Sequence, residues 1–446
     1  MAKQRSKKGK WYRELESKIT GGKANAGVIG LGYVGLPLSI ELVHAGYRVT
    51  GFDVSDQKVK LLNRGKSDID DVPDSAVANA VKGNKFRATT DPKKLANMDT
   101  ISICVPTPLS KTKDPDVSYI LAAMDWVKRH ISKGTLVVLE STTYPGTTED
   151  LILPMLEEKG LKAGQDFFLC FSPERVDPGN ATYTTKNTPR VVGGITPECT
   201  AIGKLFYEQS IPNIHGVSST RAAEMVKLLE NTFRAVNIGL VNEVAVMCDR
   251  LGLDVWEIID AAATKPFGFM PFYPGPGLGG HCIPIDPHYL SWKLKSLNYY
   301  ARFIELAGDI NSHMPEYVVE RIARMLNERA SKALNKANLF VLGVAYKKDI
   351  KDVRESPALD VIQLLAKQGA RVKYNDPFVP EIAWNAGSHR SQKLTKAAIA
   401  KADATVILTN HSSYDYQWIV DNAKMVFDTR NATKGIRRNR SKVELL

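Results

Sequence analysis

The 446-residue sequence lacks the features of a secreted or membrane-spanning protein. No apolar run approaches the roughly 20 residues that a helix needs to cross a bilayer, and no apolar signal core follows the basic N-terminus. The five cysteines are scattered without Cys-x-x-Cys spacing, which argues against a disulfide framework and a structural zinc site. These absences predict a cytoplasmic protein with free thiols and no bound metal.

The formal net charge of +12 is concentrated at the two ends of the chain. Runs of lysine and arginine of this kind are usually solvated, so we expect residues 1–24 and 436–446 to be basic tails. No recognised nucleic-acid-binding motif accompanies them, and neither a nucleic acid nor a membrane is an expected partner. The remaining positive charge suits an enzyme that acts on an anionic diphosphate.

A chain of this length predicts two or three domains. The first begins with a short apolar strand at Ala26, followed by Gly30, Gly32 and Gly35 in the pattern Gly-x-Gly-x-x-Gly and then by a helix. A second strand ends at Asp53. This order of strand, glycines, helix, strand and acid is the fingerprint of dinucleotide binding, and an acid at this place favours NAD over NADP.

Alternating strands and helices continue to about residue 215. Three of the expected strands are followed by loops that contain Thr107, Thr142 and Glu174. In a parallel sheet such loops face the ligand crevice, so these side chains are candidate site residues. Taken alone, Thr142 could also merely cap a turn, and Glu174 could be a solvated loop acid.

The pattern then changes to one long helix over 219–251. Apolar residues recur at steps of three and four along it, which suits a connector between domains and a dimer surface. Lys227 and Asn231 are four residues apart and therefore point the same way. Next to a nucleophile, this pair could stabilise a developing oxyanion.

The glycine- and proline-rich stretch from Phe272 to Asp286 cannot form a sustained helix and is expected to be a loop with many free amides. Cys282 lies near its end, before an expected helix whose N-terminus would stabilise a thiolate. Asp286, four residues later, would share a face with the thiol. These features favour a reactive nucleophile over a buried structural cysteine.

A second system of strands and helices occupies about residues 338–431 and has no Gly-x-Gly-x-x-Gly. We expect it to bind a different nucleotide, with Lys347, Arg354 and Arg430 available for phosphate or carboxylate groups. The predicted fold is therefore α/β, with two Rossmann-like doubly wound parallel-sheet domains joined by a long central helix. The expected domain boundaries are 25–215, 216–310 and 311–435.

The chain contains the sequence motifs Gly30-x-Gly-x-x-Gly, Glu140-Ser-Thr-Thr, Ser172-Pro-Glu-Arg, Lys227-x-x-x-Asn, Pro274-Gly-Pro-Gly-Leu-Gly-Gly-His-Cys-x-x-x-Asp and Lys347-Lys-Asp. With these motifs in this order, the sequence resembles the UDP-glucose/GDP-mannose dehydrogenase family over about residues 26–431. The resemblance implies a homodimer with an N-terminal NAD domain and a C-terminal UDP-sugar domain. It implies cofactor contacts by Gly30, Gly32, Tyr33, Val34, Gly35, Asp53, Thr107 and Thr142. It implies substrate contacts by Glu174, Arg175, Lys227, Asn231, Gly275, Gly277, Gly279, Lys347 and Arg430.

The resemblance further implies a four-electron oxidation of a sugar C6 alcohol to a carboxylate with two NAD in succession. Cys282 would capture the aldehyde as a thiohemiacetal, and a thioester would then be hydrolysed. Lys227 and Asn231 would hold the oxyanions. Asp286, with Thr142 and Glu174 positioning water, would manage proton transfer.

Arg175 and its neighbours look like the branch of the family that oxidises UDP-N-acetylhexosamines. The sequence is most similar to bacterial UDP-N-acetylglucosamine 6-dehydrogenases, which feed surface polysaccharide synthesis. UDP-N-acetylmannosamine and UDP-glucose remain alternative substrates, because Arg175 could instead form a local salt bridge. Three other readings also stay open: a single-step β-hydroxyacid-type dehydrogenase, a non-catalytic NAD and sugar-nucleotide sensor, and nucleic-acid binding through the basic tails.

Overall fold

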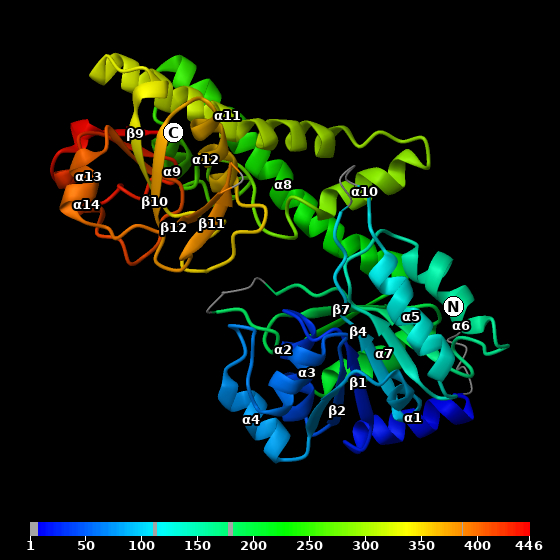
Figure 1. Cartoon of the computed structure of the whole chain (residues 1–446). Coiled ribbons are helices and arrows are strands. Elements are labelled where there is room, and N and C mark those ends of the chain that lie inside the picture. Colours follow the sequence, from blue (N-terminus) through cyan, green and yellow to red (C-terminus); the bar gives the residue numbers. More distant parts are fainter. Residues whose placement is uncertain (1–7, 110–113, 177–181, 386) are drawn as a thin grey trace. The chain divides into compact units, whose positions relative to one another are not determined.

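The computed structural model describes residues 8–109, 114–176, 182–385 and 387–446. The chain forms two compact units, each built around a parallel sheet (Figure 1). Unit 1 comprises Met1–Glu230 and His288–Asn298, and unit 2 comprises Asn231–Pro287 and Tyr299–Leu446. Two helices, α8 (Thr220–Leu251) and α10 (Asp286–Lys295), contribute residues to both units.

Unit 1 contains an eight-stranded sheet in the order β3-β2-β1-β4-β5-β6-β7-β8. The first six strands are parallel, β7 is antiparallel to β6, and β8 is parallel to β7. The order 3-2-1-4-5-6 is that of the doubly wound dinucleotide-binding fold. The strands are β1 (Asn25–Ile29), β2 (Arg48–Phe52), β3 (Phe86–Thr89), β4 (Thr100–Ile103), β5 (Leu136–Leu139), β6 (Phe168–Phe171), β7 (Arg190–Gly194) and β8 (Ile214–Val217).

Helices cover both faces of this sheet, and each face has its own hydrophobic cluster. Alternate residues of a strand serve the two clusters: Val28 packs in one and Ile29 in the other. The helical segments are α1 (Lys10–Thr20), α2 (Gly35–His44), α3 (Asp56–Asn63), α4 (Asp74–Lys82), η1 (Pro92–Asn97), α5 (Ser118–His130), η2 (Thr148–Ile152), α6 (Leu153–Glu157) and α7 (Pro197–Glu208).

The expectation of a solvated N-terminal tail is wrong for the residues that form α1. Tyr12, Leu15 and Ile19 of this helix are buried in the core of unit 1. The ring of Tyr12 meets Phe168 edge-on at a centroid distance of 5.7 Å. Apolar residues at steps of three and four form a buried helical face, and the surrounding lysines occupy the opposite face. Residues 1–7 lie outside the described part of the chain.

Unit 2 contains a five-stranded parallel sheet in the order β10-β9-β13-β14-β15 and a separate antiparallel pair, β11 and β12. The strands are β9 (Asn338–Leu342), β10 (Arg371–Asn375), β11 (Glu381–Trp384), β12 (Gly387–Arg390), β13 (Ala404–Ile407), β14 (Val426–Asp428) and β15 (Val443–Leu445). The helical segments are α9 (Val255–Ala262), α11 (Arg302–Ala330), η3 (Leu334–Lys336), α12 (Pro357–Lys367), α13 (Lys396–Lys401), α14 (Tyr416–Asn422) and η4 (Arg440–Lys442). Together the two sheets confirm the α/β fold class with two Rossmann-like domains.

The expectation of a solvated C-terminal tail is wrong for the residues that form β15, whereas residues 437–441 are exposed as expected. Residues of β15 pair in parallel with β14 and extend the sheet by one strand. The ammonium group of Lys442 donates to three carbonyls at the end of α14, the shortest bond being 2.8 Å to Ala423. The basic residue therefore caps a helix C-terminus, where orphan carbonyls and the helix dipole favour a cation.

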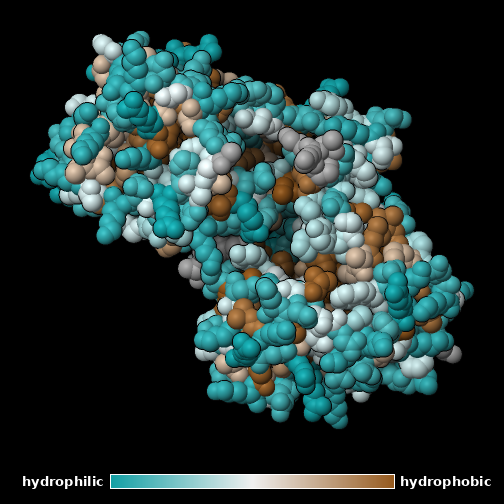
Figure 2. Space-filling model, viewed as in Figure 1, coloured by the Kyte–Doolittle hydropathy of each residue, from teal (hydrophilic) through white to brown (hydrophobic). Residues whose placement is uncertain are grey.

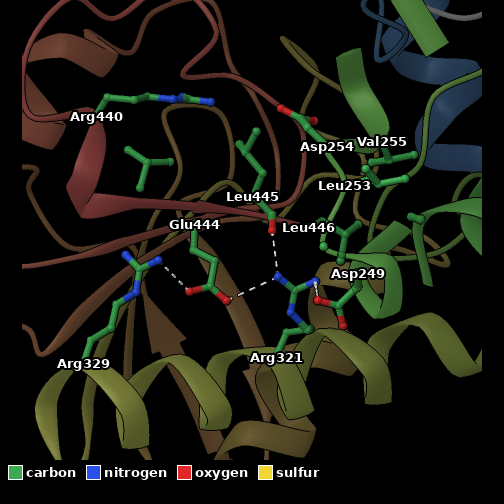
Figure 3. Close-up of a pocket in the computed structure, with 13 residues that line it drawn as sticks. Asp249, Leu253, Asp254, Val255, Arg321, Arg329, Arg440, Glu444, Leu445 and Leu446 are labelled. Atoms are coloured by element: carbon green, nitrogen blue, oxygen red, sulfur yellow. Dashed lines mark hydrogen bonds and ion pairs between the residues drawn. The ribbon is translucent and has the colours of Figure 1, made fainter. Parts of the chain in front are cut away.

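Glu444 anchors this strand to α11 beside a cavity of about 350 Å³ (Figure 3). Its carboxylate receives Arg321 at 3.3 Å and Arg329 at 3.0 Å. Arg321 also donates to the carbonyl of Leu445 at 3.1 Å and pairs with Asp249 of α8 at 3.2 Å. The last residues of the chain thus join α8, α11 and the sheet of unit 2.

In the part of the chain that the structure describes, no helix combines the length and apolar character needed to cross a membrane. Figure 2 shows a mainly hydrophilic face on which several apolar patches are visible. The apolar stripe predicted on the long helix is largely exposed: Leu240 of α8 is 54% exposed and Leu251 is 71% exposed. The buried face of this helix is made instead by smaller residues such as Ala235, Val241 and Ala245.

We expect the substitution Glu444→Gln to lower the unfolding midpoint by about 2–8 °C, because the buried Arg321 would lose one of its two carboxylates. Differential scanning calorimetry measures this shift. Arg438→Ala is the matched control, since its pair with Asp421 is solvent-exposed on the arginine side and worth little. An equal, small shift for both variants would contradict the anchoring role of Glu444.

Candidate active site

The glycine motif of unit 1 forms a tight turn between β1 and α2. Gly30 has a φ of +89°, and a Cβ there would lie 2.6 Å from the carbonyl oxygen of Cys104. A Cβ on Gly35 would lie 1.9 Å from the carbonyl oxygen of Gly30, whereas one on Gly32 would meet nothing within 4 Å. The outer glycines are therefore required by packing, and the middle one leaves open surface where a pyrophosphate can approach the backbone.

Asp53 follows β2 and faces this turn. One carboxylate oxygen accepts the amide of Leu31 at 3.0 Å, and the other accepts the amide of Ser55 at 2.9 Å. Each oxygen keeps further acceptor capacity for the hydroxyls of a ribose. Tyr33 is 42% exposed and Val34 is the residue before α2. The open cradle and the oriented acid together fit NAD.

Thr142 and Lys227 are brought together in unit 1. The ammonium group of Lys227, on α8, donates a short hydrogen bond to the hydroxyl of Thr142, in the loop after β5. The lysine is only 8% exposed. Thr107, after β4, accepts a hydrogen bond on its carbonyl from the hydroxyl of Tyr289 at 2.9 Å. The predicted strand-end residues therefore make defined contacts rather than lying in solvated loops.

Glu174 is held by an arginine that the sequence analysis did not identify. Arg190 donates to Glu174 at 2.6 Å and, through its other terminal nitrogen, to Glu140 at 2.6 Å. Tyr207 donates to the second oxygen of Glu140, also at 2.6 Å. Although burial opposes it, the charges of Glu140 and Glu174 raise the pKa of Arg190. The only sequence signal was an arginine at the start of the otherwise apolar strand β7.

Arg175 forms a local salt bridge. Its guanidinium donates to both carboxylate oxygens of Glu230, at 3.1 and 2.6 Å, and to the carbonyl of Pro189 at 2.8 Å. A local salt bridge is the alternative to the expected contact between Arg175 and the acetamido group of the substrate. In the structure, each of the three guanidinium nitrogens donates one hydrogen bond within unit 1.

Cys282 lies one turn before α10 in unit 2. Its carbonyl accepts the amides of Ile285 at 3.1 Å and Asp286 at 2.8 Å, which starts the helical turn. Asp286 is 1% exposed, and its carboxylate receives the side-chain amide of Asn231 at 2.7 Å. The other four cysteines of the chain are buried, whereas Cys282 is partly exposed. The accessible thiol therefore lies close in the chain to an ordered, buried acid.

The glycines before Cys282 let its loop pack closely on the C-terminal sheet of unit 2. A Cβ on Gly275 would lie 2.5 Å from a terminal nitrogen of Arg430, and one on Gly279 would lie 2.6 Å from Tyr346. Gly277 has a φ of +133°. Since Tyr346 directly precedes Lys347, the predicted substrate residues Gly275, Gly279 and Arg430 meet in one region, and the loop of Lys347 adjoins it.

Arg430 has no carboxylate ion pair among the described residues. Its side chain donates to the carbonyl of Leu408 at 3.1 Å, and burial lowers its pKa to about 10 against the opposing charge of Asp428. A partly buried guanidinium with unused donors beside a glycine loop suits a phosphate or carboxylate ligand. Arg354, by contrast, is paired with Asp352 at 2.6 Å.

Glu224 is a further buried acid that the sequence analysis missed. It lies on α8 one turn before Lys227 and accepts the amides of Gly146 at 2.6 Å and Thr148 at 2.9 Å, as well as the Thr148 hydroxyl at 2.7 Å. It thereby fixes the loop that carries Thr142. Burial raises its pKa from 4.5 to about 7, despite these donors.

We expect the free energy of unfolding to fall as the pH rises through the window from about 4.5 to 7, because the folded state holds a proton on Glu224 that the unfolded state has lost. The contribution is of the order of 3 kcal/mol. Chemical denaturation of the wild type and of Glu224→Gln at several pH values tests this. The stability of the variant relative to the wild type should rise between pH 5 and pH 8; a pH-independent difference would contradict the raised pKa.

The comparisons with known proteins agree with this geometry. Residues 24–211, 221–313 and 340–435 match, in turn, the NAD binding domain, the central domain and the UDP binding domain of the UDP-glucose/GDP-mannose dehydrogenase family. The UDP-N-acetyl-D-glucosamine 6-dehydrogenase of Pseudomonas aeruginosa is 34% identical over 79% of this chain and 82% of its own. The UDP-N-acetyl-D-mannosamine dehydrogenase of Pyrococcus horikoshii is 34% identical over 91% of this chain and 95% of its own.

Solved structures give the same result. A UDP-D-ManNAc dehydrogenase from Pyrococcus horikoshii superposes with a TM-score of 0.84 at 33% identity, covering 94% of this chain and 98% of that one. The UDP-N-acetyl-mannosamine dehydrogenase from Staphylococcus aureus gives 0.81 at 31% identity, covering 95% and 97%. The chain therefore belongs to the UDP-glucose/GDP-mannose dehydrogenase family and is an NAD-dependent UDP-sugar dehydrogenase.

Proposed function

We propose that this enzyme oxidises the C6 alcohol of UDP-N-acetylglucosamine to the carboxylate, with Cys282 as a covalent nucleophile. Each sugar consumes two NAD⁺ and one water and yields two NADH, the uronate and three protons. NAD, held by the glycine turn and Asp53, supplies the hydride acceptor for both oxidations. The thiol adds to the intermediate aldehyde to give a thiohemiacetal, and oxidation of that adduct gives a thioester.

The observation that carries this proposal is the arrangement around Cys282 in unit 2. A partly exposed thiol follows a glycine loop, and the buried Asp286 begins the next helix with its carboxylate fixed by Asn231. Binding of NAD and a sugar nucleotide alone requires no thiol and no oriented acid. These groups support covalent catalysis, with Asp286 taking part in proton transfer.

The other proposed catalytic groups lie in unit 1. Lys227, whose ammonium group donates to Thr142, would stabilise the oxyanions of the alcohol and thiohemiacetal stages together with Asn231. Glu174, whose carboxylate is oriented by Arg190, would position the water that attacks the thioester. That attack forms a carbon–oxygen bond, breaks the carbon–sulfur bond and returns Cys282 as the leaving group.

The choice of UDP-N-acetylglucosamine rests on similarity to the Pseudomonas aeruginosa enzyme named for that sugar. UDP-N-acetylmannosamine is the second candidate, because several relatives named for it are as similar and are matched over more of the chain. Since Arg175 is paired with Glu230, it does not favour one sugar over another.

We expect two NADH per limiting UDP-N-acetylglucosamine and a higher kcat/KM for this sugar than for UDP-N-acetylmannosamine or UDP-glucose. Absorbance of NADH at reaction end point and initial rates measure both quantities. A yield of two NADH with a higher kcat/KM for another sugar would support the mechanism and contradict the proposed substrate. One NADH per sugar would overturn the covalent role of the thiol.

Cys282→Ala serves as the companion variant, because it removes the nucleophile without adding bulk. We expect it to lose the four-electron turnover by at least about a hundredfold. Cys248→Ala, at a buried cysteine of α8, is the matched control and should keep normal turnover. Full turnover by the Cys282→Ala variant would favour a single-step dehydrogenase.

We also propose a homodimer formed through α8. Phe233, Leu240 and Met247 follow one stripe of the helix and are 46%, 54% and 48% exposed. On α11, also in unit 2, Phe303 is 76% exposed. Exposed apolar residues at helical spacing are the usual sign of a protein interface, and a second copy of the same stripe is a self-complementary partner.

Leu240→Glu should shift the protein from dimer to monomer, because the dimer would have to bury a charge in the apolar stripe. Analytical ultracentrifugation at micromolar concentrations distinguishes the two states. Tyr119→Glu, on α5, is 49% exposed in the wild type and serves as a control that leaves the dimer intact. A wild type that sediments as a monomer would exclude this interface.

A further inference from the structure

A buried arginine connects two strand-end carboxylates in unit 1. Arg190 is the first residue of β7, and its side chain is 4% exposed. One terminal nitrogen donates to Glu140, which directly follows β5, and the other donates to Glu174, which follows β6. The guanidinium also lies 4.6 Å from the ring centroid of Tyr207, which supports it from α7.

The two carboxylates differ in what surrounds them. Glu140 has a fully buried side chain, and its oxygens are occupied by Arg190 and by the hydroxyl of Tyr207. The side chain of Glu174 is 10% exposed. One of its oxygens receives Arg190, and the other receives the amides of Arg175 at 2.8 Å and Val176 at 3.0 Å. Glu140 is therefore an internal counter-charge, while Glu174 is the member that can reach a ligand.

Arg190 acts on Glu174 in two ways. Its donor fixes the plane of the carboxylate from one side while the loop amides fix it from the other. Its positive charge is also the only cation within hydrogen-bond distance of both acids among the described residues. Without it, two carboxylates would share a buried cluster that has no counter-charge.

We propose that Arg190 is a positioning residue for Glu174 and acts on the hydrolysis of the Cys282 thioester. This inference rests on the proposed function. Arg190 holds the Glu174 carboxylate in the orientation that directs water to the acyl carbon. In the proposed mechanism the chemical role of Glu174 is to position the attacking water, so Arg190 acts mainly on the step after both NADH have formed. Glu140 and Tyr207 hold Arg190 in place.

The test is rapid-mixing kinetics of Arg190→Gln and Arg190→Lys with saturating NAD⁺ and UDP-sugar. For Arg190→Gln we expect a retained burst of two NADH per active site, followed by a steady state slowed by about ten- to a hundredfold. Mass spectrometry of acid-quenched enzyme should find the acyl adduct on Cys282.

Arg190→Lys keeps the charge but cannot place two separate nitrogens on two carboxylates, so it should restore only part of the rate. Arg129→Gln, an exposed arginine on α5, controls for loss of an arginine as such. In the double variant Arg190→Gln/Glu174→Gln, the steady-state rate should equal that of Glu174→Gln alone, because Arg190 acts through Glu174.

Additive losses in the double variant, or a burst that falls in proportion to the steady state, would overturn the role of Arg190. If Arg190→Gln does not fold, the Arg190→Lys variant gives the same burst readout, with a smaller loss in the steady-state rate. If the wild type yields two NADH and a Cys282 adduct, the proposed function holds and only the role of Arg190 is overturned. A wild type that yields one NADH and no adduct would remove the proposed function itself.

Discussion

Helix α8 holds both ends of the loop that carries Cys282, and the position of the thiol depends on these contacts. The amide of Gly275 donates to the side chain of Asn242 at 2.9 Å, and Asn231 donates to Asp286 at 2.7 Å. The two asparagines are about three turns apart on α8, so they project from a similar side of the helix. Asn242 is itself fixed by Asn311 of α11 at 2.8 Å. A loop rich in glycine and proline has little structure of its own, and these buried amides supply the order that it lacks.

In each unit an aspartate directly follows a strand of the parallel sheet, but the hydrogen-bond partners of the two aspartates differ. Asp53 in unit 1 accepts one backbone amide on each oxygen and retains capacity for a ribose. Asp376 in unit 2 accepts the amides of Val344, Ala345, Phe378 and Val379. It also contacts His411 at 3.0 Å. Its acceptor sites are used inside the protein, which agrees with a domain that has the Rossmann-like topology but not the dinucleotide site.

The sequence predicted those features that depend on neighbouring residues. The glycine turn, Asp53, the long helix and the loop before Cys282 each follow from a local pattern, and the structure contains all of them. Arg190 and Glu224 were missed because their partners are distant in sequence: Arg190 meets Glu140, and Glu224 meets Gly146. Apart from the arginine at the start of β7, neither segment has a sequence pattern that predicts these contacts.

The two tails were predicted wrongly because charge was given more weight than pattern. In α1, the spacing of Tyr12, Leu15 and Ile19 forms a buried face whatever the number of surrounding lysines. Near the C-terminus, charged residues find partners within unit 2: Lys442 caps α14, and Glu444 pairs with Arg329 of α11. The net charge of a segment therefore does not decide whether it packs; the spacing of its few apolar residues and the partners available to its charges do.

The buried charges of unit 1 lie near the carboxyl ends of its strands, where they connect loops rather than stabilise the core. Glu224 reaches from α8 to Gly146 and Thr148, and Arg190 reaches from β7 to Glu140 and Glu174. Apolar residues of similar size would often give equal or greater stability than such buried charges. Hydrogen bonds with fixed direction, however, set the orientation of a loop in a way that apolar packing does not. These buried groups lie at the edge of the sheet that faces the ligand crevice. Small displacements of Thr142 or Glu174 there would change the rate of the reaction, so the free-energy cost of burying the charges falls where precise orientation matters.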